Sequence, residues 1–142
     1  MNTDNHLSIL LDYISNNKNP IQLNALHLES CTIKREFTVK IIKSLRTNEH
    51  MKRLSLVDLN CMEMQKMLRL LYSSLKSNTS LEYLSLSNNE IYDYKYINKL
   101  IRKNKLIHTL DIRGNYMSED ILRDLYSSLL QNIELEELLF DS

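Results

Sequence analysis

The sequence of 142 residues predicts an α/β solenoid, in which strand–helix units stack along one axis. Five segments share one spacing of apolar residues and begin at residues 23, 51, 81, 107 and 135. Within each segment apolar and polar residues alternate as in a strand, whereas the stretches between them have helical spacing. In addition, LRLLYSSLKSN at 68–78 and LRDLYSSLLQN at 122–132 agree at eight of eleven positions. Such close repetition indicates that one structural unit recurs along the chain.

The strand segments follow the pattern L-x-x-L-x-L-x-x-N-x-L, with a period of 26 to 30 residues. The copies are LNALHLESCTI, MKRLSLVDLNC, LEYLSLSNNEI, IHTLDIRGNYM and LEELLFDS. In the second copy Leu59 stands where the pattern has Asn, and Cys61 stands where it has Leu. The turn after the second strand is therefore the least regular of the predicted turns.

The segments between the strands have the apolar spacing of amphipathic helices. In the second of them the apolar residues recur at i, i+3, i+4, i+7 and i+11. These residues are Met64, Met67, Leu68, Leu71 and Leu75. The repeated LYSSL is then part of the outer helix of two units, and its leucines face the sheet.

This pattern resembles the leucine-rich repeat family over about residues 20–142. The long period and the helical spacers resemble the ribonuclease-inhibitor-like subclass, similar to the repeats of NOD-like receptors, tropomodulin and Ran GTPase-activating proteins. The resemblance implies a curved solenoid in a single domain, residues 1–142, with the parallel sheet on the concave side and the helices on the convex side. It also implies that Asn89 and Asn115 belong to an asparagine ladder that satisfies backbone groups at the turn after each strand.

Asparagine takes the place of glycine as the residue that ends the helices. Gly and Pro each occur once in the chain, so the usual turn-forming residues are scarce. Asn48, Asn78, Asn104 and Asn132 each lie three residues before the first apolar position of a repeat. Because Asn tolerates the left-handed conformation, the sequence predicts that these four residues end their helices in that conformation.

The two ends of the stack differ. Residues 4–20, DNHLSILLDYISNNKNP, have the spacing of an amphipathic helix, so we expect a capping helix within residues 1–20. At the other end Ser142 follows the fifth strand directly. An uncapped edge strand exposes backbone donors and acceptors. We therefore expect a fragment of a longer structural solenoid, a monomer, or self-association through the C-terminal edge strand.

The sequence contains no pattern of catalytic or metal-binding residues. Gly114 is the single glycine, so no glycine-rich phosphate loop exists. His27 and Cys31 lie four residues apart but lack the paired-ligand spacing of zinc sites. Cys31 and Cys61 are expected to be two reduced thiols. We therefore expect no enzymatic activity, no metal and no cofactor.

Charge and hydropathy narrow the classes of partner. The 18 basic and 18 acidic residues give a net charge of zero, which argues against a nucleic-acid partner. No apolar run approaches the roughly 20 residues that a membrane-spanning helix needs. The N-terminus, MNTDNHL, lacks the features of a signal peptide. We expect a cytoplasmic protein with no membrane partner.

Charge is also uneven along the chain. Residues 34–53 contain seven basic and two acidic residues, and residues 95–105 contain five basic and no acidic ones. Residues 134–141 contain four acidic and no basic ones. The basic excess fits solvated helix faces, and the acidic end could steer a basic partner.

The concave sheet is the surface predicted to carry function. The polar places between the strand leucines point into the hollow of the solenoid. Near the middle of this array lie the candidate binding residues Arg53, Glu82, Tyr83, Ser85, His108, Asp111 and Arg113. Tyr and Arg are frequent anchors of protein interfaces. We expect a non-catalytic module that binds a protein partner, as an adaptor, regulator or pathogen effector; the alternatives are a GTPase-regulating protein of the Ran-activating type and the longer solenoid.

Overall fold

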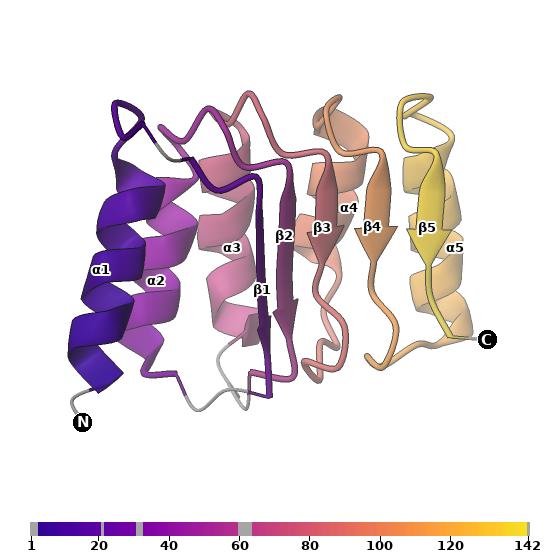
Figure 1. Ribbon diagram of the computed structural model, residues 1–142. Coiled ribbons are helices and arrows are strands. Elements are labelled where there is room, and N and C mark those ends of the chain that lie inside the picture. Colours follow the sequence, from indigo (N-terminus) through magenta and orange to yellow (C-terminus); the bar gives the residue numbers. More distant parts are fainter. Residues whose placement is uncertain (1–2, 21, 31–32, 60–63, 142) are drawn as a thin grey trace.

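The computed structural model describes residues 3–20, 22–30, 33–59 and 64–141, and it shows a sheet with helices along one side (Figure 1). The helices are α1 (Thr3–Ser15), α2 (Arg35–Ser44), α3 (Met64–Leu75), α4 (Lys95–Lys103) and α5 (Glu119–Leu129). The strands are β1 (Ala25–Glu29), β2 (Arg53–Val57), β3 (Tyr83–Ser85), β4 (Thr109–Asp111) and β5 (Glu137–Leu139). The expectations for Cys31 and Cys61 fall outside the described residues.

The five strands form one parallel sheet in chain order, β1-β2-β3-β4-β5. Its register matches the repeat, because equivalent places of successive copies pair with one another. The fourth place runs across the sheet as Leu26, Leu54, Leu84, Leu110 and Leu138. Each of the strands β1 to β4 is followed by a helix that returns the chain to the same end of the sheet, as parallel strands require. The predicted α/β solenoid with a parallel sheet is confirmed.

The core lies between the sheet and the helices. The strand leucines at the fourth and sixth places are fully buried in the central strands β2 and β3, as are Ile42 of α2 and Leu71 of α3. Each such side chain contributes about 1.5–3 kcal/mol relative to an exposed one. At the two edges of the sheet the corresponding Leu26 and Leu138 are only half-buried, because each edge strand has one neighbour.

The left-handed residues lie after the strands and not at the helix ends. Ser30, Asp58, Asn88 and Gly114 have φ angles of 48°, 45°, 57° and 69°. All four occupy the eighth place of their repeat, where the chain turns sharply away from the strand. A further left-handed residue, Glu90, follows in the third repeat, with φ of 55°.

The prediction that four helix-ending asparagines are left-handed is wrong. None of the four has a positive φ: Asn48, Asn78, Asn104 and Asn132. Asn104 is extended, with φ −82° and ψ 132°. Asn48, Asn78 and Asn132 are instead buried. A buried amide needs partners, so the reason for Asn at this place is hydrogen bonding rather than backbone freedom.

We call the buried asparagines Asn48, Asn78 and Asn132 the entry ladder, because they lie just before the chain enters the next strand. Asn78 shows the hydrogen bonds that such a residue makes. Its Nδ2 donates to the carbonyl of Leu45 at 2.7 Å and to that of Asn48 at 3.2 Å, both in the preceding repeat. Its Oδ1 accepts from the backbone N–H of Ser80 at 3.0 Å and of Leu81 at 2.7 Å, at the start of the next strand. One side chain thus satisfies backbone groups of two neighbouring repeats.

The same arrangement recurs along the stack. Asn132 donates to the carbonyls of Ile101 at 2.6 Å and Asn104 at 3.0 Å. Asn48 donates to the carbonyl of Ile14, near the end of α1, at 2.7 Å. The entry ladder therefore ties the unit of α2 to α1 through Asn48, that of α3 to α2 through Asn78, and that of α5 to α4 through Asn132. Asn104 accepts from the N–H groups of Leu106 and Ile107 in its own repeat.

A second, exit ladder lies at the other end of the strands. Asn89 donates to the carbonyl of Leu56 at 2.6 Å, and its Oδ1 accepts from the N–H of Leu59 at 3.3 Å. The Oδ1 of Asn115 accepts from the N–H groups of Asn89 and Ile91, both at 3.0 Å. The predicted ladder role of Asn89 and Asn115 is confirmed. Asn89 also serves the second repeat, which has Leu59 in place of its own asparagine.

The entry ladder predicts opposite outcomes for two Asn-to-Gly substitutions. Asn78→Gly removes the buried amide and should lower the free energy of unfolding by about 2–4 kcal/mol, since each buried group left unpaired costs about 1–3 kcal/mol. Asn88→Gly places Gly in a left-handed conformation on an exposed turn and should be nearly neutral. Urea denaturation of the two variants measures the difference. Equal midpoints for both would show that the entry ladder contributes nothing.

Candidate binding surface on the concave sheet

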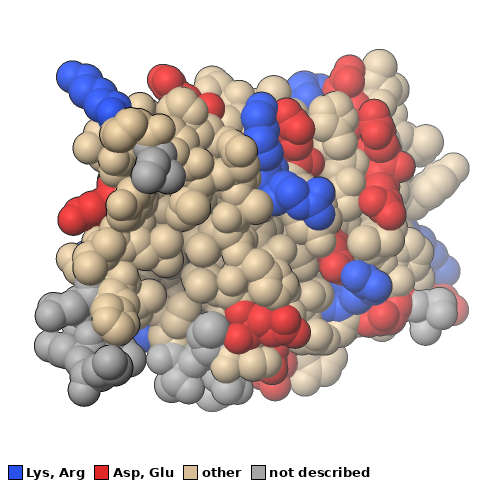
Figure 2. All heavy atoms as spheres, viewed as in Figure 1, with Lys and Arg blue, Asp and Glu red and all other residues tan. Residues whose placement is uncertain are grey.

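The helices leave one face of the sheet open (Figure 1). This face contains a shallow hollow of about 400 Å³ that extends across the strands from β1 to β4. Five of the seven predicted binding residues line it: Arg53, Tyr83, Ser85, Asp111 and Arg113. Residues of both charges lie side by side on this face, and no single sign covers it (Figure 2). The hollow is thus polar, mixed in charge and open to solvent.

Side-chain size explains where the hollow lies. Ser55 of β2, Ser85 of β3 and Ser87 just after β3 form a floor of small, buried residues. The hydroxyls of Ser85 and Ser87 lie 3.2 Å apart and hydrogen-bond to each other. The larger Tyr83 and Arg113 rise beside this floor. A row of small residues between large ones leaves a depression on an otherwise even sheet.

Arg53 and Tyr83 form one wall of the hollow. They are direct neighbours in the register of β2 and β3. The guanidinium carbon of Arg53 lies 4.0 Å from the centre of the Tyr83 ring, which is a cation–π contact. Arg53 is exposed and Tyr83 is half-buried, so the stack presents both a charge and an aromatic edge to solvent.

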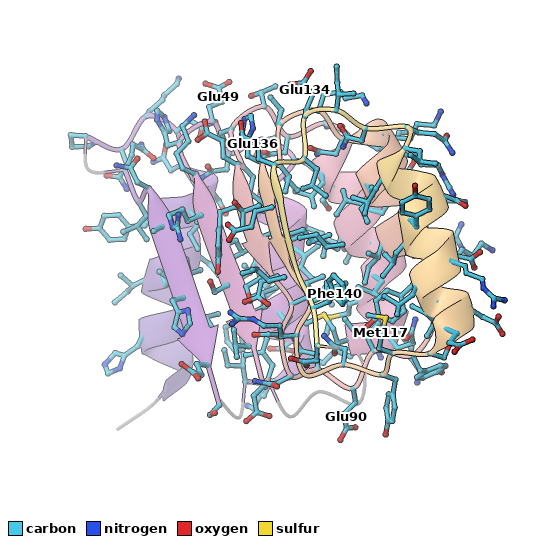
Figure 3. All side chains as sticks on the ribbon, turned by 90° about the vertical axis from the view of Figure 1, so that its right-hand side faces the viewer. Glu49, Glu90, Met117, Glu134, Glu136 and Phe140 are labelled. Carbon is cyan, nitrogen blue, oxygen red and sulfur yellow. The ribbon has the colours of Figure 1, made fainter. Side chains whose placement is uncertain are left out.

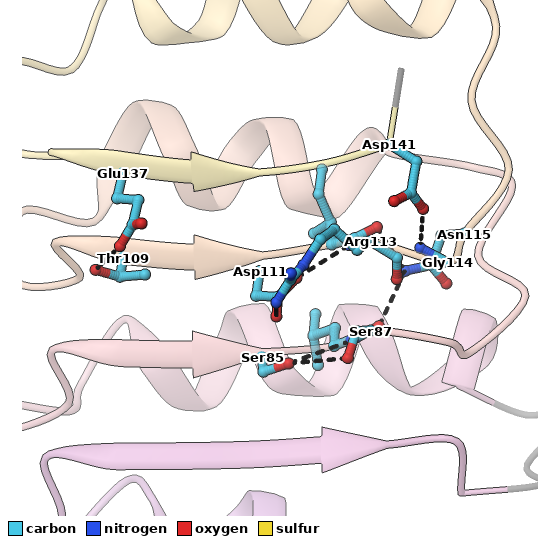
Figure 4. Close-up of polar contacts among 11 residues, drawn as sticks. Ser85, Ser87, Thr109, Asp111, Arg113, Gly114, Asn115, Glu137 and Asp141 are labelled. Carbon is cyan, nitrogen blue, oxygen red and sulfur yellow. Dashed lines mark hydrogen bonds and ion pairs between the residues drawn. The ribbon is translucent and has the colours of Figure 1, made fainter.

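Asp111 and Arg113 form the opposite wall (Figure 4). Arg113 donates from Nε to Asp111 Oδ1 at 3.0 Å and from Nη2 to Oδ2 at 2.8 Å. The Asp111 side chain is 5 % exposed and that of Arg113 is 54 % exposed. The hydrogen bond from Arg113 holds the pKa of the Asp111 carboxyl below its usual value, and Asp111 in turn raises the pKa of Arg113. The pair keeps a buried carboxylate ionised and an exposed guanidinium in one orientation.

Glu82 and His108, the other two predicted residues, do not line the hollow. They occupy the second place of their repeats, where the chain enters the strand. Glu82 pairs with Lys52 at 2.9 Å, and the hydrogen bond from Lys52 lowers the pKa of the Glu82 carboxyl. His108 Nδ1 lies 3.5 Å from a carboxylate oxygen of Glu136. These contacts form a separate polar row along the entry side of the sheet.

The hollow also includes residues that the prediction left out. His27 Nε2 lies 2.9 Å from Glu29 Oε2 on β1, and both line the hollow together with Val57 and Ser87. These residues occupy the same fifth and seventh places as the predicted ones, so the repeat pattern contained the signal for them. Asn88 lines it as well, but its place follows from the left-handed turn, which the sequence did not reveal.

The last strand adds acidic side chains next to the hollow. The Asp141 carboxylate accepts a hydrogen bond from the backbone N–H of Gly114, and Glu137 accepts one from the Thr109 hydroxyl at 3.3 Å (Figure 4). Within the residues that the structure describes, no group of three or more His, Cys, Asp or Glu could hold a metal ion. In the same part of the chain, no helix is long and apolar enough to cross a membrane.

The lowered pKa of Asp111 implies that the free energy of unfolding depends on pH. Because the folded-state pKa lies below the unfolded value of about 3.9, the pair stabilises the fold above that pH, and this contribution is lost as pH falls through the folded pKa. Asp111→Asn should cost about 1.5–3 kcal/mol at pH 7, as expected for hydrogen bonds to a charged group. The difference from wild type should shrink in urea denaturation below about pH 3.

Glu137→Gln is the matched control, because the carboxylate of Glu137 is exposed. This variant should change stability little at either pH. If the cost of Asp111→Asn is the same in acid and at neutral pH, the ion pair is not its cause.

No protein-family model matches the sequence, and no curated protein matches it. The solved structures that are similar in fold include the following two. The C-terminal domain of Caenorhabditis elegans tropomodulin is 12 % identical, with a TM-score of 0.80 over 96 % of this chain and 83 % of that one. Actin-binding site 2 of leiomodin-1 is 14 % identical, with a TM-score of 0.69 over 93 % of this chain and 77 % of that one. The chain therefore has the leucine-rich-repeat-like fold of these two proteins, and its assignment to the ribonuclease-inhibitor-like subclass stays a prediction.

Proposed function

We propose that the chain is a non-catalytic module that binds a protein partner in the concave hollow. The observation that carries this proposal is the pair of walls formed by the Arg53–Tyr83 stack and the Asp111–Arg113 ion pair. In protein interfaces, a few Tyr, Trp and Arg residues supply most of the binding energy. Here two arginines and a tyrosine are gathered around one depression.

The walls of the hollow are ordered before any partner arrives. The two hydrogen bonds to Asp111 and the contact with Tyr83 hold the guanidinium groups of Arg113 and Arg53. Holding a long side chain in place reduces the entropy that binding would otherwise cost, about 0.5–1.5 kcal/mol for each one. Arg has five N–H donors, so donors of Arg113 remain for carboxylate or carbonyl oxygens of a partner. We expect a partner segment with such acceptors and with an apolar group that covers Tyr83.

The polar contacts in the hollow favour binding over catalysis. Ser85 pairs with Ser87, and His27 pairs with Glu29. Among the described residues of the hollow, these contacts provide no Ser–His pair of the kind that activates a nucleophile. We therefore expect the hollow to act on a partner through its shape and its hydrogen-bond donors.

Actin is the first partner to test, because one of the similar structures is an actin-binding site of leiomodin-1. We place this binding in the cytoplasm, in keeping with the expected reduced thiols. A GTP hydrolysis assay with a panel of small GTPases addresses the Ran-activating alternative directly. If actin does not bind, cross-linking followed by pull-down can supply another partner for the same variants.

The proposal predicts which side chains matter for binding. Tyr83→Ala and Arg53→Ala should each raise the Kd for the partner by about tenfold or more, since a hot-spot truncation costs roughly 2 kcal/mol. Both side chains contact solvent, so the unfolding midpoint should change little. Arg113→Ala should weaken binding too, but it also unpairs the buried Asp111 and should lower stability.

Lys43→Glu is the control on the convex side, where Lys43 is exposed on α2. It should leave the Kd within about twofold, because an isolated exposed charge changes mainly the association rate. If Lys43→Glu abolishes binding while Tyr83→Ala has no effect, the concave hollow is not the binding surface.

A further inference from the structure

Charge is separated between two regions of this net-neutral chain. Helices α2, α3 and α4 contain the basic residues Arg35, Lys40, Lys43, Lys66, Arg69, Lys95, Lys99, Arg102 and Lys103. These three helices are described throughout, and Glu36 is their single acidic residue. The C-terminal end has the opposite sign, with Glu119, Asp120, Asp124, Glu134, Glu136, Glu137 and Asp141 against Arg123. One region of the chain is therefore electrostatically complementary to another region of an identical chain.

The acidic end also exposes three large apolar side chains in one line. Tyr126, Leu130 and Ile133 are spaced i, i+4 and i+7 along α5 and the turn after it, and they are 65 %, 69 % and 90 % exposed. We call these three residues the α5 stripe. Figure 3 looks onto this end, where Glu134, Glu136 and Phe140 border α5 and β5. Aligned anchors at this spacing are typical of a helix that packs into a groove.

Helix α3 shows what covers such a position inside the stack. Its Tyr72 occupies the place of Tyr126 in the repeated LYSSL segment, and its ring lies 6.1 Å from that of Tyr96 on α4. At the two following places the chain has Lys76 and Thr79 after α3, where it has Leu130 and Ile133 after α5. The α5 stripe is therefore more apolar than the face that its near-identical counterpart presents.

A receiving groove lies between the C-terminal ends of α3 and α4. It is a pocket of about 330 Å³ with an apolar lining and a basic rim. The apolar side chains include Tyr72, Leu75 and Leu100, and the lysines are Lys76, Lys103 and Lys105. Lys105 is held in place by the carbonyl of Gln131 at 3.2 Å. We call this pocket the α3–α4 groove.

We propose that the α5 stripe of one copy of the chain docks in the α3–α4 groove of a second copy. Ile133 and Leu130 fill the apolar pocket, and the adjacent Glu134 meets the lysine rim. The two surfaces are different, so the contact is heterologous and leaves one stripe and one groove free for further copies. The concave hollow takes no part, so this self-association is independent of the proposed partner binding.

Sedimentation velocity of the full chain tests this inference. The weight-average mass should rise with concentration, and it should fall when ionic strength is raised to about 1 M, where the Debye length is about 3 Å. The double substitution Leu130→Lys and Ile133→Thr introduces the residues found at the equivalent places after α3, Lys76 and Thr79. This stripe variant should raise the apparent Kd for self-association by about tenfold or more. Both positions are exposed, and an unchanged circular dichroism melting curve confirms that the variant is folded.

A complementation experiment distinguishes this contact from a symmetric one. A groove variant, Lys76→Glu with Lys103→Glu, keeps the α5 stripe, and the stripe variant keeps the groove. Each alone should remain monomeric, and an equimolar mixture should form a dimer and nothing larger. Three results overturn the proposal: a wild-type chain that stays monomeric at all concentrations, a groove variant that self-associates as wild type does, or a mixture that stays monomeric. Tyr83→Ala, in the concave hollow, should self-associate like wild type.

Discussion

The structure depends on satisfying buried backbone groups at both ends of five stacked strands. A chain with one Gly and one Pro does so with asparagine side chains that reach into neighbouring repeats. Asn78 at the entry side and Asn89 at the exit side each contact backbone groups of the repeat before them. Because a buried amide or carbonyl without a partner costs about 1–3 kcal/mol, these contacts hold adjacent repeats in one register. That register in turn aligns the side chains at equivalent places of neighbouring strands on the concave face. The candidate binding surface therefore depends on the two ladders.

The repeat pattern was sufficient to predict the strands, the helices and the order of the sheet, because apolar periodicity is set by burial within each unit. It was not sufficient to predict backbone conformation at the turns. Asn can serve either as a left-handed residue or as a buried amide, and only the position of the preceding repeat decides between them. The left-handed positions are occupied by Ser30, Asp58 and Asn88, which share no residue type. Gly114, at the same place, was the one signal in the sequence.

The candidate site was predictable to the extent that it follows from register. Arg53 and Tyr83 occupy the same place of adjacent repeats, so their contact follows once the strands pair. Asp111 is the last residue of β4 and Arg113 follows two residues later, where the two oppositely charged side chains meet. The hollow itself depends on the small size of Ser85 and its neighbours, whereas the prediction considered only large and charged side chains as anchors. For that reason the second-place residues were included in the prediction although they lie outside the hollow.

In a solenoid each repeat contacts only its neighbours, so the burial of a helix depends on how many neighbours it has. Helix α3 has a neighbour on each side and buries residues along its whole length, from Met64 to Leu75. In α5, which the structure describes throughout, the buried residues are Leu125 and Ser128. Nearly the same sequence is thus well buried at one position and mostly exposed at the other. The apolar stripe that α5 exposes follows from its having α4 as its one helix neighbour among the described residues. Any surface that covers the stripe stabilises the repeat that contains α5, and through the entry ladder at Asn132 this stabilisation extends to α4.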